Sequence, residues 1–251
     1  MRKNLLVLGG TTEARGLCAA LADAGIAGIV SLAGRVARPA PLGLPLRVGG
    51  FGGVAGLVHY LRAQRITHVI DATHPFAAQM SRNAVEACAQ SRTPLIALTR
   101  APWTAQSGDC WTEVADIAAA VTALTGAPRR VMLAVGRMHL DDFAVNPQHS
   151  YLLRLVDPPT APLAFPDAEV IVDRGPFTRA GDRALLERHR TELVVSKNAG
   201  GTGARAKIDA ARDLGLPVLM IARPVLPPRR EAYTIADVLH WLDHTPTDLG
   251  V

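Results

Sequence analysis

Polar side chains that could do chemistry follow an apolar stretch in the first half of the chain. Val69–Ile70 leads directly into Asp71, Thr73 and His74, and Pro75 comes next. Ligands of parallel α/β sheets bind outside the carboxyl ends of the strands. We therefore expect Thr73 and His74 at a strand-to-helix corner, with Pro75 in the first helical turn, where its missing N–H has no partner to lose. His74 could act as an acid, a hydrogen-bond donor or a helix cap, whereas Asp71 is better explained as fixing the turn.

A glycine turn follows the first apolar stretch, residues 4–8. The turn and the start of the next segment contain Gly9, Gly10, Thr11, Thr12 and Arg15. Glycines let the backbone approach an anion closely, and the N-terminus of a following helix offers unpaired N–H groups. These residues favour phosphate binding, with a tight turn capped by threonine as the alternative. The turn is not a GxGxxG motif, and no GxxxxGK[ST] motif occurs in the chain.

A second glycine-rich loop, SKNAGGTG at 196–203, also lies between an apolar stretch and an amphipathic one. Its candidate binding residues are Lys197, Asn198, Gly200, Gly201 and, beyond the loop, Lys207. The lysine brings a positive charge, and the glycines free backbone N–H groups for an anion. A solvated loop is the alternative interpretation. Two such loops in one chain fit a dinucleotide.

Arginines follow the expected second strand. Arg35 lies just beyond residues 27–32, Arg38 and Arg47 come soon after, and no acidic residue stands at the end of the strand. In dinucleotide-binding units an arginine at this place can hold the 2′-phosphate of NADP. Arg35 therefore favours NADP over NAD, and solvated surface arginines are the alternative.

Other suggestive residues are interpreted as structural or solvated. His240 and His244 have the spacing of metal ligands on a helix, but no third ligand is apparent, so we expect no metal site. The pairs Arg129-Arg130 and Arg229-Arg230 are expected to be solvated.

Apolar stretches alternate with amphipathic stretches along the whole chain. Strands are expected at 4–8, 27–32, around 69–70, and at 94–98, 131–135, 151–156, 169–173, 192–196 and 217–221. Helices are expected at 13–24, after 53, up to about 90, and at 114–124, 178–190, 204–214 and 234–242. This alternation predicts an α/β fold with mostly parallel sheets. A linker-like Gly126-Ala127-Pro128 divides it into Rossmann-like lobes at 1–127 and 128–251, with a cleft between them.

The composition narrows the class of protein. Hydrophobic residues make up 49% of the 251 residues and charged residues 20%, which predicts a sizeable core. The chain has no apolar run long enough to span a membrane, and three widely spaced cysteines predict neither a disulfide framework nor a metal site, so a cytoplasmic location is expected. The net charge of +5 favours anionic partners. Nucleic acid is not expected among them, because the chain has no basic run or recognised binding motif.

Four segments together resemble the precorrin-6A reductase family of corrin-ring biosynthesis. They are LVLGGTTEAR near the start, GGFGG, VIDATHPFA and SKNAGGTGARAKIDAA. They occur in order across almost the whole chain, and Ala199 stands where serine is common. The resemblance implies hydride transfer from NADPH to a ring carbon of precorrin-6A, with a proton added at the neighbouring carbon to give precorrin-6B.

The resemblance also implies which residues lie along the cofactor. They are Gly9, Gly10, Thr11, Thr12, Arg15, Thr73, His74, Pro75, Phe76, Lys197, Asn198, Gly200, Gly201 and Lys207. His74, Lys197 or an ordered water could donate the proton, and His74 is expected to position the reactants more than to act as the sole acid. The partner is then an anionic tetrapyrrole, with transient contacts to neighbouring pathway enzymes. A non-enzymatic NADPH sensor and an NAD(P)-dependent reductase of another substrate are the alternatives.

Overall fold

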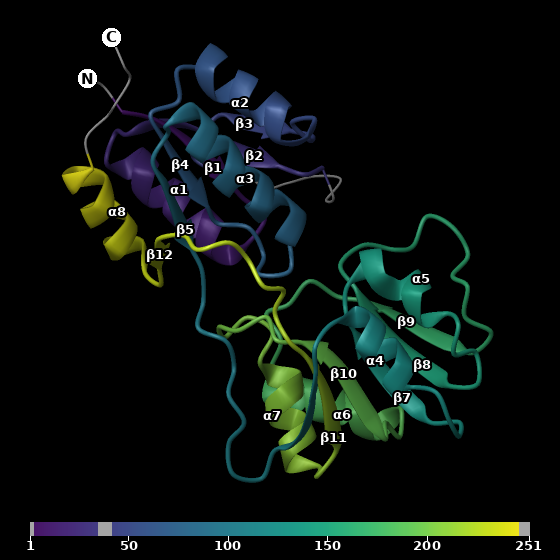
Figure 1. Ribbon diagram of the computed structural model, residues 1–251. Helices are drawn as coiled ribbons and strands as arrows, with labels where there is room; N and C mark the ends of the chain where they lie inside the picture. The colour runs from purple at the N-terminus through teal and green to yellow at the C-terminus, as the bar shows by residue number, and fades with distance from the viewer. Residues whose placement is uncertain (1–2, 35–41, 246–251) are drawn as a thin grey trace. The chain divides into compact units, whose positions relative to one another are not determined.

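Figure 1 shows the computed structural model of the protein, which describes residues 3–34 and 42–245. The chain forms two compact units. The first comprises residues 1–100 and 225–251, and the second comprises residues 101–224. Each unit contains one six-stranded sheet, and all the strand pairs are parallel. The predicted α/β class is confirmed.

The first sheet has the strand order of doubly wound dinucleotide-binding folds. From one edge to the other its strands are β12 (Glu231–Ala232), β5 (Leu95–Leu98), β4 (His68–Asp71), β1 (Asn4–Leu8), β2 (Ala27–Leu32) and β3 (Leu46–Val48). From β1 the chain proceeds outward to β2 and β3 on one side, and then from β4 to β5 and β12 on the other side. The strand order therefore reverses between β1 and β4, which is the place where such sheets bind ligands.

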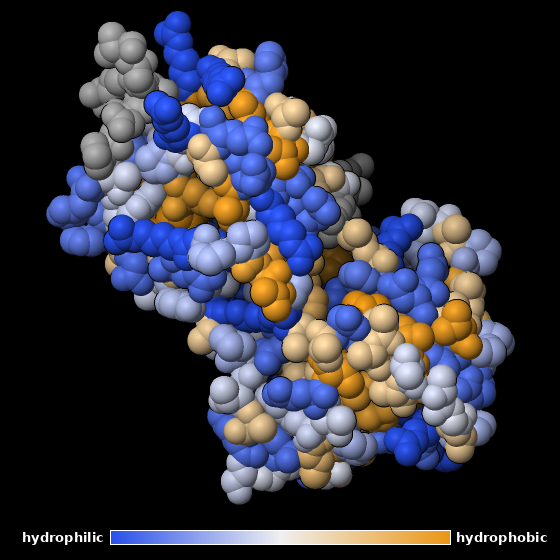
Figure 2. All heavy atoms as spheres, in the orientation of Figure 1, coloured by the Kyte–Doolittle hydropathy of each residue, from blue (hydrophilic) through white to orange (hydrophobic). Residues whose placement is uncertain are grey.

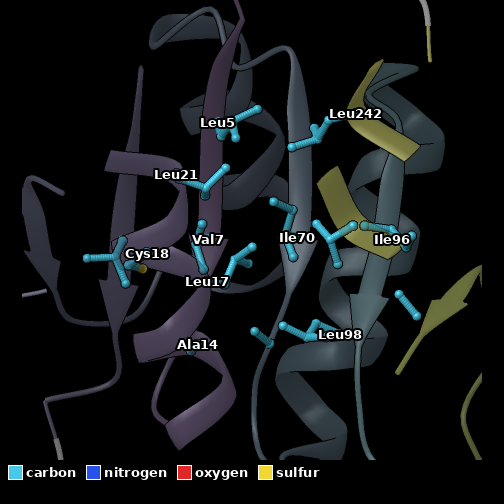
Figure 3. Packing of buried hydrophobic residues seen from close by; sticks show 14 of the residues in the cluster. Leu5, Val7, Ala14, Leu17, Cys18, Leu21, Ile70, Ile96, Leu98 and Leu242 are labelled. Carbon is cyan, nitrogen blue, oxygen red and sulfur yellow. The ribbon is translucent and has the colours of Figure 1, made fainter. Parts of the chain in front are cut away.

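Helices cover both faces of this sheet. Alternate residues of β1 point to opposite faces, so Leu5 and Val7 pack with α1 (Thr12–Asp23) and α8 (Ile235–His244), as Figure 3 shows. Leu6 and Leu8 pack with the other pair of helices, α2 (Gly53–Ala63) and α3 (Ala78–Ser91). Burial on both faces explains why residues 4–8 are apolar without alternation.

The second sheet repeats this arrangement. Its order is β6 (Cys110–Val114), β11 (Pro217–Ile221), β10 (Leu193–Lys197), β7 (Arg130–Ala134), β8 (Ser150–Leu155) and β9 (Ala168–Val172). The helices of this unit are α4 (Ile117–Ala123), α5 (Leu140–Phe143), α6 (Arg179–Arg188) and α7 (Ala206–Asp213), with a 3-10 turn at Arg137–His139. Leu186 of α6 and Ile208 of α7 pack on one face against Met132, Val194 and Val218.

The division of the chain differs from the predicted boundary between residues 127 and 128. Strand β6 pairs with β11 in the second sheet, although it lies before that boundary. Strand β12 and helix α8 return to the first unit, where β12 pairs with β5. The segment Gly126-Ala127-Pro128 connects α4 to β7 inside the second unit. Sequence pattern marks the helices and central strands, but it does not specify which sheet an edge strand joins.

Pro75 is not in the first turn of α3, which begins at Ala78. A turn comes between them, closed by the Ala77 N–H donating to the His74 carbonyl oxygen at 2.7 Å.

Within the described part of the chain, the helices are too short or too polar to cross a membrane. Hydrophobic and hydrophilic residues are intermixed on the side shown in Figure 2.

Candidate functional site

A pocket of about 390 Å³ opens at the carboxyl ends of the central strands of the first sheet. Its walls are the residues that follow β1, β2, β3 and β4, together with the start of α3. Gly9, Gly10, Thr73 and His74 all line it, so the structure brings these four predicted site residues together. The volume lies within the usual range of small-molecule sites.

Glycines leave the wall of this pocket open. A Cβ atom at Gly10, where φ is +120°, would have no heavy atom within 4 Å, and the same is true of Gly49, Gly52 and Gly53. Gly9 differs, because its Cβ atom would lie 3.0 Å from Leu32 Cδ2. Gly9 therefore serves the packing of the turn, whereas the other glycines leave space into which a ligand can approach the backbone.

Thr11 connects the first glycine turn to the corner after β4. It is the N-cap of α1, and its hydroxyl accepts from the Ala14 N–H at 3.1 Å. The same hydroxyl donates to the Ala72 carbonyl oxygen at 2.8 Å. Thr12 and Arg15 follow on the exposed side of α1. The hydroxyl of Thr11 thus holds the two loops of the pocket together.

A buried carboxylate fixes the corner itself. Asp71 accepts from the Thr73 N–H at 3.1 Å, the Thr73 hydroxyl at 2.7 Å and the Ser81 hydroxyl at 2.6 Å. The Arg229 guanidinium supplies a further bond of 2.6 Å and an ion pair. The expectation that Arg229 is solvated is wrong, because its side chain is only 8% exposed. Asp71 fixes the turn, as its position predicted.

His74 has a defined orientation at the pocket. Its Nδ1 accepts from the Phe76 N–H at 3.2 Å, and its ring lies 5.9 Å from the Phe76 ring. A neutral imidazole that accepts at Nδ1 carries its proton at Nε2. With Nδ1 accepting from the Phe76 N–H, the proton of the neutral His74 ring lies at Nε2.

Arg47 supports the third wall of the pocket and is a residue whose role the sequence did not reveal. Its guanidinium donates to the carbonyl oxygens of Gly49 and Gly50, each at 2.6 Å. It also lies 3.9 Å from the centre of the Phe51 ring. These contacts hold the glycine loop after β3 in place. Arg35, the predicted partner of a 2′-phosphate, lies outside the described residues.

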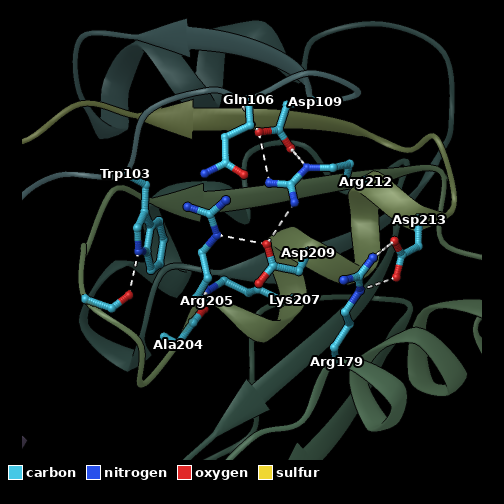
Figure 4. A network of polar contacts seen from close by, with 11 residues as sticks. Trp103, Gln106, Asp109, Arg179, Ala204, Arg205, Lys207, Asp209, Arg212 and Asp213 are labelled. Atoms are coloured by element: carbon cyan, nitrogen blue, oxygen red, sulfur yellow. Dashed lines mark hydrogen bonds and ion pairs between the residues drawn. The ribbon is translucent and has the colours of Figure 1, made fainter.

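The second glycine loop belongs to the other unit, and its polar side chains bind the protein itself. Asn198 accepts from the Trp103 N–H at 2.8 Å and donates to the Trp103 carbonyl oxygen at 2.9 Å. The Trp103 indole N–H donates to the Gly201 carbonyl oxygen at 2.7 Å, as Figure 4 shows. Trp103 thus holds the loop at two points, a role that nothing in its own sequence neighbourhood indicates.

Close packing accounts for Gly200. A Cβ atom there would lie 2.3 Å from the Ala101 carbonyl oxygen, and φ is +69°. Arg223 fixes the same stretch by donating to the carbonyl oxygens of Asn198 and Ala199 at 2.9 and 3.0 Å. The conformation of this loop is therefore set by contacts within the unit.

Lys207 is buried beneath the loop. Its ammonium donates to the Ala204 carbonyl oxygen at 2.7 Å and lies 5.1 Å from the centre of the Trp103 ring. Burial lowers the pKa of Lys207 to about 7; the charge of Arg154 acts in the same direction and that of Asp182 opposes it. Lys197, by contrast, is partly exposed at the carboxyl end of β10.

The sheet order, the glycine turn after β1 and the pocket at the reversal point define an α/β protein of the dinucleotide-binding class. The family described as "Precorrin-6x reductase CbiJ/CobK" matches residues 4–243. The chain belongs to this family, which acts in cobalamin biosynthesis and whose members are oxidoreductases that use a nicotinamide cofactor.

Individual relatives agree with this family. The precorrin-6A reductase of Rhodobacter capsulatus is 59% identical over 98% of this chain and 99% of its own length. That of a Sinorhizobium species is 47% identical over 88% of this chain and 85% of its own. The cobalt-precorrin-6A reductase of Priestia megaterium is 27% identical over 95% of this chain and 97% of its own. A solved structure titled "CobK precorrin-6A reductase" superposes with a TM-score of 0.93, at 59% identity, covering 99% of this chain and 100% of that one.

Proposed function

We propose that this protein reduces precorrin-6A to precorrin-6B with NADPH, in the cytoplasm. The pocket at the reversal point of the first sheet carries the proposal, because it joins a glycine turn suited to phosphates with a corner that presents His74. Relatives named precorrin-6A reductase, without cobalt in the name, are 42–59% identical to the chain. Relatives named for the cobalt form are 27–30% identical. We therefore propose the metal-free substrate.

The residues at the pocket fit a nicotinamide dinucleotide. Open space beside Gly10 and the N-terminus of α1 suit its phosphates, and we propose that Gly10, Thr12 and Arg15 hold them, with Gly9 shaping the turn. The described end of β2, residues 32–34, has no acidic side chain that would bind the ribose 2′-hydroxyl of NAD. This supports NADPH, with Arg35 as the proposed partner of its 2′-phosphate.

NADPH, when bound, supplies the hydride for the ring carbon of the substrate. The protein must align the two molecules and keep water out. We propose that Thr73, His74, Pro75 and Phe76 face the nicotinamide end, with Thr11 and Asp71 fixing their backbone. His74 would hold a proton at Nε2 and orient the reactants.

The second glycine loop would contribute mainly by its shape. We propose that Lys197 and Gly201 approach the ligands, since Lys197 is the last residue of β10 and lies at the carboxyl edge of its sheet. Asn198, Gly200 and Lys207 would act through the loop, because their contacts lie inside the unit.

Anaerobic mixing of the protein with precorrin-6A and NADPH tests the proposal. We expect loss of nicotinamide absorbance together with a spectral change of the pigment, and slower turnover with NADH. NADPH binding without oxidation would instead support the sensor alternative. Oxidation only with an unrelated carbonyl substrate would support a different reductase.

A further inference from the structure

Part of the pocket in the first unit is lined by residues outside the glycine turn after β1 and the corner after β4. These residues come from the end of β3, the loop that follows it and the first two turns of α3, and they are Val48, Phe51, Gln79, Met80 and Asn83. Helices α2 and α3 pack on the same face of the sheet, so the loop leading into α2 and the start of α3 enclose one part of the pocket. We call these five residues the β3–α3 end of the pocket.

Apolar side chains form much of the β3–α3 end. Phe51 and Met80 both pack against the hydrophobic cluster between the sheet and helices α2 and α3. Val48 is 55% exposed, although it is a large aliphatic residue. Among the described residues that line the pocket, none is an aspartate, glutamate, lysine or arginine. An uncharged planar group with apolar faces fits these walls better than a phosphate or a carboxylate does.

Two amide side chains add polar groups to the β3–α3 end. Gln79 Nε2 donates to Asn83 Oδ1 at 2.8 Å. Neither side chain makes another hydrogen bond within the described part of the chain. Because each amide has an acceptor oxygen and a donor nitrogen, the pair still offers Gln79 Oε1 as an acceptor and Asn83 Nδ2 as a donor.

This pattern of one acceptor and one donor is complementary to the edge of adenine. Adenine has an amino group that donates beside a ring nitrogen that accepts, and asparagine and glutamine pair with it in this way. Hypoxanthine has an oxygen in place of that amino group. Gln79 could donate to this oxygen only by turning its amide, which would break its bond to Asn83. The amide pair therefore favours adenine over hypoxanthine.

The position of the β3–α3 end agrees with the order of the cofactor along the sheet. In dinucleotide-binding folds the ribose that carries adenine lies at the end of the second strand, where its 2′-hydroxyl or 2′-phosphate is held. Strand β3 is the next strand beyond β2. The base attached to that ribose is therefore expected beside the loop after β3.

We propose that the β3–α3 end of the pocket binds the adenine of the dinucleotide. Gln79 accepts from the amino group and Asn83 donates to a ring nitrogen, while Val48, Phe51 and Met80 contact the faces of the base. This inference rests on the proposed use of NADPH. It makes Gln79 and Asn83 the residues that select adenine over other purines in the cofactor.

Titration with a base-modified cofactor tests these hydrogen bonds. Wild-type protein should bind NADPH about tenfold more tightly than reduced nicotinamide hypoxanthine dinucleotide phosphate. Gln79→Ala and Asn83→Ala should each weaken NADPH binding about fivefold and make the two Kd values about equal. Gln90→Ala is the matched control and should behave like wild type, because Gln90 donates to Glu86 Oε1 at 2.8 Å on the same helix but does not line the pocket. Equal Kd values in the wild-type protein, or an unchanged preference in both variants, would overturn the inference.

Cofactor fragments separate this inference from the proposed function, because their binding needs no turnover. Adenosine 2′,5′-bisphosphate lacks the nicotinamide ring, and Gln79→Ala should weaken its binding as much as that of NADPH. The same variant should bind reduced nicotinamide mononucleotide like wild type. Loss of affinity for the nicotinamide fragment instead would overturn the adenine assignment even if precorrin-6A is reduced. Discrimination between the two purine cofactors without reduction of precorrin-6A would support the adenine assignment and overturn only the proposed reaction.

Discussion

Arg229 Nη1 lies 2.6 Å from Asp71 Oδ2, although the two residues are 158 positions apart in the chain. The side chains are 8% and 1% exposed. Asp71 also accepts hydrogen bonds from Thr73 and Ser81, so the segment that returns from the second unit is joined directly to the corner that carries His74. A residue far from the pocket in sequence thereby helps to set its geometry.

Replacing Arg229 by methionine should destabilise the protein by about 3–5 kcal/mol, because the buried Asp71 charge would lose its partner. Urea unfolding measures this loss. Arg230→Met is the control. Because Arg230 is exposed, its replacement should lower the free energy of unfolding by less than about 0.5 kcal/mol. If both variants unfold alike, the ion pair does not support the corner. The double variant Asp71→Asn/Arg229→Met should lose less than the sum of the single changes.

Replacing Gly10 by alanine should weaken NADPH binding by about tenfold while costing roughly 1–3 kcal/mol of stability from the positive φ. The added methyl group would project into open space at the pocket. Gly25→Ala is the matched control: φ there is +64° and no atom lies within 4 Å of the added Cβ, but Gly25 follows α1 away from the pocket. Titration of NADPH by fluorescence compares the two. Equal affinities would remove Gly10 from the cofactor site.

The change His74→Asn should lower kcat by about tenfold and leave stability nearly unchanged. Asparagine can still accept from the Phe76 N–H, but it cannot reproduce the donor at Nε2. Steady-state kinetics across pH measure the effect. A loss of a thousandfold or more, with one limb of the pH profile removed, would identify His74 as the general acid instead of a positioning group.

The buried ammonium of Lys207 should make stability depend on pH. Its pKa is lowered from 10.5 to about 7 by burial, so the unfolded chain binds more protons than the folded chain between these values. The free energy of unfolding should therefore rise with pH from about 7 to about 10, by up to roughly 1.4 kcal/mol per pH unit. Below about pH 7 the full cost of charging the buried amine is present. Lys207→Met should lack this rise, and parallel profiles for the two proteins would contradict the burial argument.

Much of the fold follows from local pattern. The strands at 4–8, 27–32 and 217–221 have the predicted bounds, and the other buried strands and most helices differ from their predicted bounds by a few residues. The missed strands, β3, β6 and β12, are short or largely exposed at sheet edges. Their sequences have no apolar run or clean alternation. These segments are strands because they pair with a neighbouring strand of the sheet, and a local sequence pattern does not predict that pairing.

The site was predictable where glycine and strand-end residues define it. Gly9, Gly10, Thr73 and His74 line the pocket. The partners of Asn198 and Arg229 were not predictable, because Trp103 and Asp71 are 95 and 158 positions away from them. The same amide or guanidinium could bind a ligand or the protein, and the tertiary fold alone decides between these uses.

The separation of β12 and α8 from the rest of the first sheet has a consequence for biosynthesis on the ribosome. Residues 101–224, the whole second unit, are translated before β12 and α8 exist. Multidomain chains generally fold their N-terminal domain first. Here the second unit can finish folding before the first. Until α8 is translated, it cannot cover the apolar face of the first sheet that contains Leu5, Val7 and Ile70. Chaperone binding or aggregation is therefore most to be expected in the interval before the last helix emerges.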